Sequence, residues 1–228
     1  MPLALAHRGD WSGSPENTLA AFAAARRAGA DMIELDVQLT ADGALVVHHD
    51  RTLERVWGVQ AAVSELRLDE IRSIGEGDAR IPELHEVLAA CPLPVMLDYK
   101  EEEPVVEPAL AAVRAADALG RVLWAGHNLV GHRLIRELEP AARIALSWTR
   151  RTPPSDRILD HLGVEWFNPE WDVLEREVVE AMHARGLKVS TWTVDDEATM
   201  RRVLDLGVDA VITNRIGVLV AVLAEAPC

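Results

Sequence analysis

Apolar and polar residues alternate most clearly in the stretch DMIELDV, residues 31–37. Successive side chains of a β-strand point to opposite faces, so three aliphatic residues would share one face and Glu34 and Asp36 the other. A buried carboxylate costs free energy unless a positive charge neutralises it. This stretch therefore predicts a strand whose acidic face meets either water or a positive group.

Short apolar runs rich in β-branched or aromatic residues recur along the whole chain. We expect eight such strands, at residues 3–7, 31–37, 94–98, 121–125, 143–147, 164–168, 187–192 and 209–213. Most intervals between them carry apolar residues at helical spacing, as Leu19, Phe22 and Ala23 do. For that helix the sequence SPEN predicts Ser14 as the N-cap and Pro15 as the first helical residue.

A glycine stands at five junctions between a helical pattern and the next strand. These glycines are Gly29, Gly120, Gly163, Gly186 and Gly207. Glycine just past a helix commonly adopts the left-handed conformation that closes the last turn. Repeated helix–glycine–strand junctions predict βα units and a parallel sheet. Eight strands fit a single (β/α)8 TIM barrel over residues 1–228. A doubly wound open sheet is the alternative, and no dinucleotide-type glycine loop supports it.

A ninth apolar run, ALVVHH at residues 44–49, follows the tight turn TADG. A parallel crossover needs about a dozen residues or more. We therefore expect this run to return antiparallel to the strand before it, as an extra hairpin strand. Residues 50–82 would then form a small insertion over the active face before the third strand of the barrel, irregular apart from one helical stretch near 64–74.

Charged and aromatic side chains gather where these strands end, which is where TIM-barrel enzymes carry their chemistry. The candidates are His7, Arg8, Glu34, Asp36, His49, Asp98, Lys100 and Trp192. Three carboxylates suit Mg²⁺ or Ca²⁺, and an arginine with a lysine suits a phosphate. Two histidines can divide general acid and general base roles near neutral pH. Together these groups are what metal-assisted phosphodiester cleavage requires.

Each candidate also has a purely structural interpretation. The acidic pair Glu34 and Asp36 could form salt bridges with arginine or lysine instead of binding a metal. A histidine at a strand end often only packs or hydrogen-bonds. His48 and His49 are adjacent in the strand and point to opposite faces, so only one of them can serve the site. Trp192 could belong to the core.

Composition narrows the possible partners. The chain has 228 residues, is 49% hydrophobic and has a net charge of -14. So acidic a surface disfavours nucleic acid and anionic membrane as partners. Cys91 and Cys228 form neither a metal-binding spacing nor a disulfide framework. The N-terminal residues do not resemble a signal peptide, and no apolar run approaches the length of a membrane span, so we expect a cytoplasmic protein without stable membrane association.

The motifs HRG, PENT, ELDVQLTADGALVVHHD, WTV and GVDAVITN together resemble those of the glycerophosphodiester phosphodiesterase family. The resemblance extends from His7 to about Asn214. It implies a (β/α)8 barrel that hydrolyses glycerophosphodiesters to glycerol 3-phosphate and an alcohol, through attack by the glycerol 2-hydroxyl. The roles that the resemblance implies are a divalent metal held by Glu34, Asp36 and Asp98, acid–base catalysis by His7 and His49, and phosphate binding by Arg8 and Lys100.

The sequence departs from the family pattern at three places. Asp98 stands where the family usually has glutamate, which is longer by one methylene. The fourth strand ends in AGHN instead of a sequence like SF, so His127 either lines the pocket or lies at its rim. The insertion at 50–82 is short. Two other functions stay open: a lysophospholipase D-like activity, for which tryptophans would supply an apolar groove, and a barrel that binds phosphorylated ligands without turnover.

Overall fold

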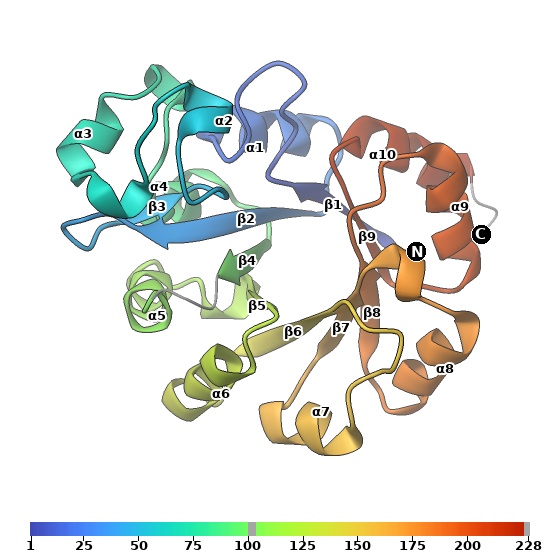
Figure 1. The fold of residues 1–228 in the computed structure, drawn as a ribbon. Coiled ribbons are helices and arrows are strands. Elements are labelled where there is room, and N and C mark those ends of the chain that lie inside the picture. The colour runs from blue at the N-terminus through green and yellow to red at the C-terminus, as the bar shows by residue number, and fades with distance from the viewer. Residues whose placement is uncertain (100–103, 226–228) are drawn as a thin grey trace.

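Eight parallel strands close into a barrel in the computed structural model, which describes residues 1–99 and 104–225 (Figure 1). These eight are β1 (Leu3–His7), β2 (Met32–Leu39), β4 (Val95–Tyr99), β5 (Val122–Gly126), β6 (Arg143–Trp148), β7 (Trp166–Pro169), β8 (Lys188–Thr191) and β9 (Ala210–Thr213), and a ninth strand, β3 (Leu45–Val47), lies outside the ring. Their order is β1-β9-β8-β7-β6-β5-β4-β2, and pairing of β1 with β2 closes the ring. The TIM-barrel prediction is confirmed, and the open-sheet alternative is wrong.

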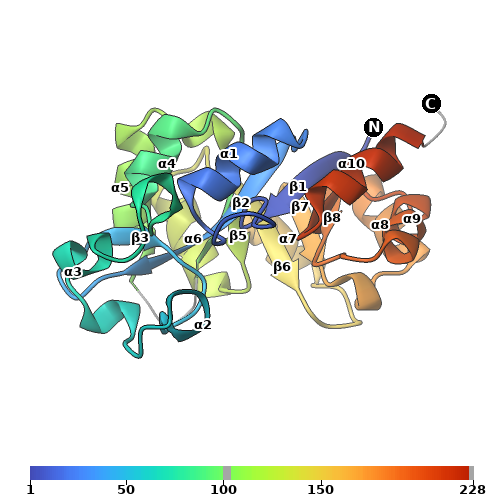
Figure 2. The same ribbon diagram turned by 90° about the horizontal axis from the view of Figure 1, so that it is seen from above.

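Helices surround the barrel and cover the outward face of its strands (Figure 2). Over the described residues they are α1 (Leu19–Arg27), α2 (Glu54–Trp57), α3 (Leu68–Arg72), α4 (Leu84–Ala90), α5 (Val106–Ala115), α6 (Leu129–Leu138), α7 (Asp156–Leu162), α8 (Arg176–Ala184), α9 (Glu197–Asp205) and α10 (Ile216–Glu225). Short 3₁₀ helices occupy Val63–Glu65, Gly77–Ala79, Leu119–Arg121 and Trp171–Val173. None of the described helices is both long and apolar enough to cross a membrane.

Strand alternation divides the apolar residues into two cores. Ile33, Leu35 and Val37 of β2 belong to the large core between strands and helices. Met32 of β2 and Met96 of β4 belong instead to a smaller cluster that fills the barrel. Every second residue of each strand thus points inward, as expected for a barrel whose interior is packed with side chains.

The extra strand β3 pairs antiparallel with the end of β2, as the short TADG turn predicted. It uses the same edge of β2 as β1 does. The Arg8 backbone N–H donates to the Glu34 carbonyl, and the His48 backbone N–H donates to the Asp36 carbonyl, each at 3.0 Å. Strand β3 therefore continues along β2 from the point where β1 ends.

The insertion over residues 50–82 packs on a small apolar cluster of its own. That cluster consists of Val46, Leu53, Val63, Ile71 and Ile81. The single helix expected near 64–74 is instead a 3₁₀ turn at Val63–Glu65 followed by α3, and α2 precedes both. The insertion lies beyond β2, on the β3 side of the barrel (Figure 2).

The start of α1 differs from the sequence prediction. The helix begins at Leu19 and its N-cap is Thr18, whose hydroxyl accepts a hydrogen bond from the Ala21 N–H at 3.2 Å. Ser14 lies in the preceding loop instead. The extra residues of that loop let the side chains of Glu16 and Asn17 turn back toward the barrel, where both are buried.

Four of the five junction glycines adopt the predicted left-handed conformation. Gly29, Gly163, Gly186 and Gly207 have φ angles between 57° and 95°. The expectation was wrong for Gly120, which lies in the 3₁₀ helix that leads into β5. At that junction Asp117 takes the left-handed position with a φ of 50°.

Candidate active site

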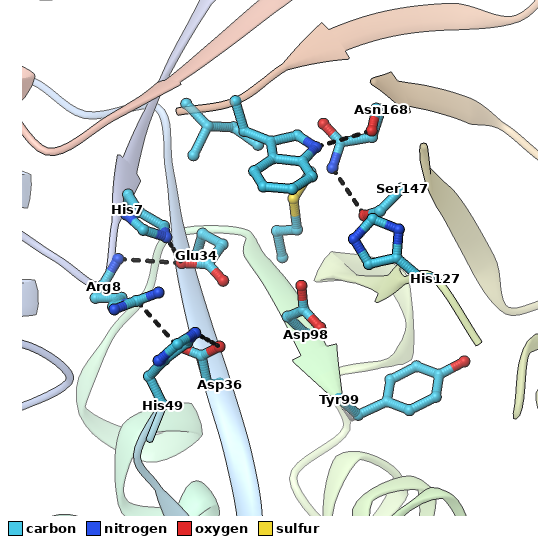
Figure 3. Close-up of a pocket in the computed structure, with 13 residues that line it drawn as sticks. His7, Arg8, Glu34, Asp36, His49, Asp98, Tyr99, His127, Ser147 and Asn168 are labelled. Carbon is cyan, nitrogen blue, oxygen red and sulfur yellow. Dashed lines mark hydrogen bonds and ion pairs between the residues drawn. The ribbon is translucent and has the colours of Figure 1, made fainter. Parts of the chain in front are cut away.

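The inward faces of β2 and β4 carry three carboxylates at the C-terminal end of the barrel. Glu34 and Asp36 on β2 are only 5% and 4% exposed. Asp98 on β4 is the register partner of Asp36. All three line a cavity of about 490 Å³, and Figure 3 shows them together at its centre. The acidic face of β2 therefore points into the barrel mouth.

Seven of the eight residues singled out from the sequence line this one cavity. They are His7, Arg8, Glu34, Asp36, His49, Asp98 and Trp192. The eighth, Lys100, lies outside the described residues. Strand alternation and the position at strand ends were thus sufficient to group these side chains.

Arg8 supplies positive charge beside the carboxylates. Its backbone N–H donates to Glu34 Oε2 at 3.1 Å, and its Nε lies 3.2 Å from Asp36 Oδ2. Asn17 Nδ2 donates to the same Asp36 oxygen at 3.0 Å. Burial first, and then the charges of Asp36 and Asp98, raise the pKa of Glu34 well above its usual value despite the opposing charge of Arg8. One arginine therefore only partly neutralises the three acids.

His7 is held through its Nδ1 atom. Asn214 Nδ2 donates to Asp195 Oδ2 at 2.7 Å, and this fixes which end of the Asn214 amide is oxygen. That oxygen lies 2.7 Å from His7 Nδ1, which must therefore carry the proton. His7 Nε2 lies on the other side of the ring, 3.8 Å from Glu34 Oε2. Burial, and next the charge of Arg8, lower the pKa of His7.

His49 is oriented in a similar way, also through its Nδ1 atom. Its Nδ1 lies 2.6 Å from Asp50 Oδ1, and its Nε2 lies 4.0 Å from Asp36 Oδ1. His48 points away from the cavity, is 1% exposed, and has its Nε2 at 3.2 Å from the Thr52 carbonyl. Of the two adjacent histidines only His49 lines the cavity, and both His7 and His49 present Nε2 to the acids.

The other wall of the cavity is neutral and comes from β5 to β8. Ser190 Oγ donates to Asn168 Oδ1 at 2.8 Å, and Asn168 Nδ2 donates to Ser147 Oγ at 3.1 Å. The indole of Trp192 donates to the Asn168 carbonyl at 2.9 Å and packs edge-on against His127, with ring centroids 5.6 Å apart. His127 is exposed and lines the cavity, so it combines the two positions considered for it.

Several residues of the site were not singled out from the sequence. Ser147 and Asn168 occupy inward positions of β6 and β7, so strand alternation could have found them. Asn214 and Glu16 lie in quoted motifs but carried no expected role. Arg55 comes from the insertion, and no local pattern marks it. Its position depends on how the insertion packs.

The loop between β1 and α1 brings Arg8 to the site through an unusual backbone path. Arg8 and Asn17 have φ angles of 59° and 58°, and Gly9 between them has 85°. A Cβ atom on Gly9 would lie 2.7 Å from the carbonyl carbon of Ala21, closer than non-bonded atoms approach. Glycine is therefore required here, because the loop passes directly against α1.

The three carboxylates do not yet form a closed ligand set. Within residues 1–99 and 104–225, no group of three His, Cys, Asp or Glu side chains converges closely enough to hold a metal ion. The acids of the cavity nevertheless share the hard oxygen chemistry that Mg²⁺ and Ca²⁺ prefer.

Comparison with known proteins assigns the barrel to a family. Residues 7–218 match the Glycerophosphoryl diester phosphodiesterase family. The chain belongs to that family. A glycerophosphodiester phosphodiesterase of Caldanaerobacter subterraneus subsp. tengcongensis is 32% identical over 93% of this chain and 93% of that protein. One of Arabidopsis thaliana is 31% identical over 93% of this chain and 70% of its own length. The protein is accordingly a phosphoric diester hydrolase.

Solved structures share the same architecture. An Oleispira antarctica phosphodiesterase, determined in complex with the product sn-glycerol-3-phosphate, matches with a TM-score of 0.87 and 23% identity over 99% of this chain and 98% of that one. A glycerophosphodiester phosphodiesterase from Agrobacterium tumefaciens matches with a TM-score of 0.81 and 24% identity over 97% of this chain and all of the other. At these identities the likeness establishes the barrel fold.

Proposed function

We propose that this protein hydrolyses glycerophosphodiesters to glycerol 3-phosphate and an alcohol, using a divalent metal and two histidines. The observation that carries the proposal is the pair His7 and His49, whose Nε2 atoms face Glu34 and Asp36 in one cavity. The product bound to the Oleispira antarctica relative is consistent with this substrate class. Family membership supplies the reaction type.

The donor chemistry of the site fits a metal held by Glu34, Asp36 and Asp98. Two of these acids are almost fully buried, and this burial, followed by repulsion from the neighbouring carboxylates, raises the pKa of Glu34. A cation would relieve this repulsion and draw the carboxylates together. When bound, the ion would supply charge stabilisation for phosphate oxygens. Asp98 stands where the family usually has the longer glutamate, so it makes the sharpest test.

Positive side chains would hold the phosphate beside the acids. Arg8 reaches the cavity from the end of β1 and is expected to donate to phosphate oxygens, as guanidinium groups do. Lys100 keeps the same proposed role. Trp192 would contact the organic part of the substrate on the neutral wall, where Ser147 and Asn168 offer hydrogen bonds.

The two histidines would move the protons of the reaction. The 2-hydroxyl oxygen of the glycerol attacks phosphorus, and its proton passes to Nε2 of one histidine. The bond from phosphorus to the leaving alcohol breaks, and the other histidine protonates the departing oxygen. Water then opens the cyclic phosphate with the proton movements reversed, which releases glycerol 3-phosphate. Because Asn214 and Asp50 occupy the two Nδ1 atoms, Nε2 is the atom that exchanges protons in each ring.

The decisive experiment is a turnover assay on metal-stripped protein. Glycerophosphocholine is supplied with Mg²⁺, Ca²⁺ or Mn²⁺, and glycerol 3-phosphate is measured by an enzyme-coupled assay. We expect turnover that is lost after chelation and restored by at least one ion. Full activity after verified metal removal would exclude the metal role. Calorimetric binding of the diester without product under every condition would instead identify a non-catalytic binding barrel.

A lysophospholipid substrate is the second candidate. Trp11 is 41% exposed, and its indole N–H donates at 3.3 Å to Asn214 Oδ1, the same oxygen that accepts from His7 Nδ1. An exposed indole at the site gives a lipid tail an apolar surface to contact. Measuring kcat/KM for glycerophosphocholine and for lysophosphatidylcholine below its micellar concentration distinguishes the two substrates. A preference for the lipid that falls in Trp11→Ala would support the lipid activity.

A further inference from the structure

Arg55 of the insertion binds two carboxylates that lie in separate loops, Glu16 and Asp50. Its Nη2 and Nη1 donate to Glu16 Oε1 and Oε2 at 2.6 and 2.9 Å. Its Nε donates to Asp50 Oδ2 at 2.5 Å. Glu16 belongs to the loop after β1, whereas Asp50 follows β3. One guanidinium therefore joins two segments that are far apart in the sequence.

Each of these carboxylates also holds a residue of the proposed active site. Glu16 Oε1 accepts a hydrogen bond from Arg8 Nη1 at 3.0 Å. Asp50 Oδ1 lies 2.6 Å from His49 Nδ1. A continuous chain of side-chain contacts thus runs from His49 through Asp50, Arg55 and Glu16 to Arg8, and its two ends line the cavity.

Glu16 and Arg55 both stay charged at neutral pH. Burial alone would raise the pKa of Glu16, but hydrogen bonds and charge from Arg55 and Arg8 outweigh it and lower that pKa to about 2. The pKa of Arg55 rises because of its hydrogen bonds with Glu16 and Asp50. Glu16 is only 7% exposed, so loss of either arginine would leave a poorly compensated buried charge.

We propose that Arg55 is a positioning residue which couples the orientation of His49 to that of Arg8. The inference rests on the proposed function, because His49 and Arg8 receive their roles there. Removing Arg55 frees Asp50 to rotate, which releases the His49 ring, and frees Glu16, which releases the Arg8 guanidinium. A displacement of about 1 Å at a reacting group can cost about a hundredfold in rate.

Two variants separate the arms of the chain. Asp50→Asn weakens the contacts of residue 50 with His49 and Arg55 but leaves the contacts of Glu16 with Arg55 and Arg8 in place. We therefore expect kcat to fall at least about tenfold while KM stays within about twofold. Glu16→Gln weakens the hold on Arg8, so KM for glycerophosphocholine should rise about fivefold or more, with a smaller change in kcat. Arg55→Met should show both effects, with kcat lower by about a hundredfold.

Arg72 provides a matched control. It lies on α3 of the same insertion, its side chain is 54% exposed compared with 51% for Arg55, and it forms an ion pair with Glu83 away from the cavity. Arg72→Met should leave kcat and KM within about twofold of the wild type. Thermal unfolding of both variants separates loss of positioning from loss of folding.

Coupling and chemical rescue complete the test. Adding Asp50→Asn to Arg55→Met should reduce kcat little further, because both changes break the same series of contacts between His49 and Arg8. Exogenous guanidinium at millimolar concentration, compared with sodium chloride at equal ionic strength, should restore part of the kcat of Arg55→Ala, since the site is half exposed. A purely structural role predicts neither result.

The proposal is overturned if folded Arg55→Met keeps kcat and KM within twofold of the wild type, or if its effect and that of Asp50→Asn multiply independently. If Arg55→Met does not fold, the other two variants decide. The proposal is then also overturned if Asp50→Asn and Glu16→Gln change kcat by the same factor as each other and KM by the same factor as each other. If the wild type itself does not turn over glycerophosphodiesters, the proposed function has failed instead, and the two failures are therefore distinguishable.

Discussion

The buried contact between Tyr99 and His132 gives a prediction whose size follows from the structure. The Tyr99 hydroxyl lies 2.7 Å from His132 Nδ1, and His132 Nε2 lies 3.0 Å from the Gly126 carbonyl. A carbonyl only accepts, so Nε2 carries the proton and Nδ1 accepts from the tyrosine. His132 is 0% exposed. The pair anchors the end of β4, next to Asp98, onto α6.

Tyr99→Phe removes the donor and leaves a buried nitrogen without a partner. The expected loss in the free energy of unfolding is about 1–3 kcal/mol. For a chain of this size each kcal/mol corresponds to a fall in Tm of about 2–4 °C. Chemical denaturation at pH 7.5 measures the loss directly. Unchanged stability would show that this hydrogen bond does not hold β4 in solution.

The same histidine makes stability depend on pH. Burial lowers the pKa of His132 from 6.5 to about 4. Between these values the unfolded chain binds a proton that the folded chain excludes, so stability falls as the pH is lowered. From pH 7.5 to pH 5.0 the contribution of this group amounts to a loss of about 2 kcal/mol.

His132→Gln provides the control, because glutamine keeps an N–H donor for the Gly126 carbonyl but does not titrate. Denaturant unfolding of the wild type and of this variant is compared at pH 7.5 and 5.0. The wild type should lose about 2 kcal/mol more than His132→Gln, since all other titrating groups are shared. Equal losses in the two proteins would refute the reasoning about His132.

Three further predictions follow from the site. Gly9→Ala should lower the free energy of unfolding by at least about 2 kcal/mol, because the new Cβ would lie 2.7 Å from the Ala21 backbone at a residue whose φ is 85°. Denaturation curves that match those of the wild type would contradict this close approach. Asp98→Asn should weaken Mg²⁺ or Ca²⁺ binding in calorimetry and lower kcat/KM by about a hundredfold or more; an unchanged metal titration would remove Asp98 from the ligand set. His7→Ala and His49→Ala should each lower kcat by about 10²–10⁴-fold while metal binding persists; loss of metal binding would argue against a role limited to proton transfer.

Much of the barrel was predictable because it rests on local signals. The two-residue period of β2 placed Glu34 and Asp36 on one face, and the structure turns that face into the barrel. The short TADG turn was sufficient to predict the antiparallel return of β3, since no parallel crossover fits in so few residues. These inferences needed only alternation and chain length.

The remaining features depend on contacts between distant segments. Ser14 and Thr18 are both acceptable N-caps, and the choice of Thr18 lets Glu16 reach Arg8. Nothing in the local sequence distinguishes Arg55 from other exposed arginines of the insertion. Its contacts with Glu16 and Asp50 exist only after β1, β3 and the insertion have come together.

The shared edge of β2 has a consequence for how the site tolerates change. The segment after β1 and the segment of His49 attach to carbonyl groups two residues apart on one strand, a spacing of about 6.5–7 Å set by backbone geometry. The distance between the two histidine-bearing segments is therefore set by the residue spacing along β2 and not by the length of any loop. Loops on either side can lengthen or shorten during evolution, or be exchanged in design, without altering that distance.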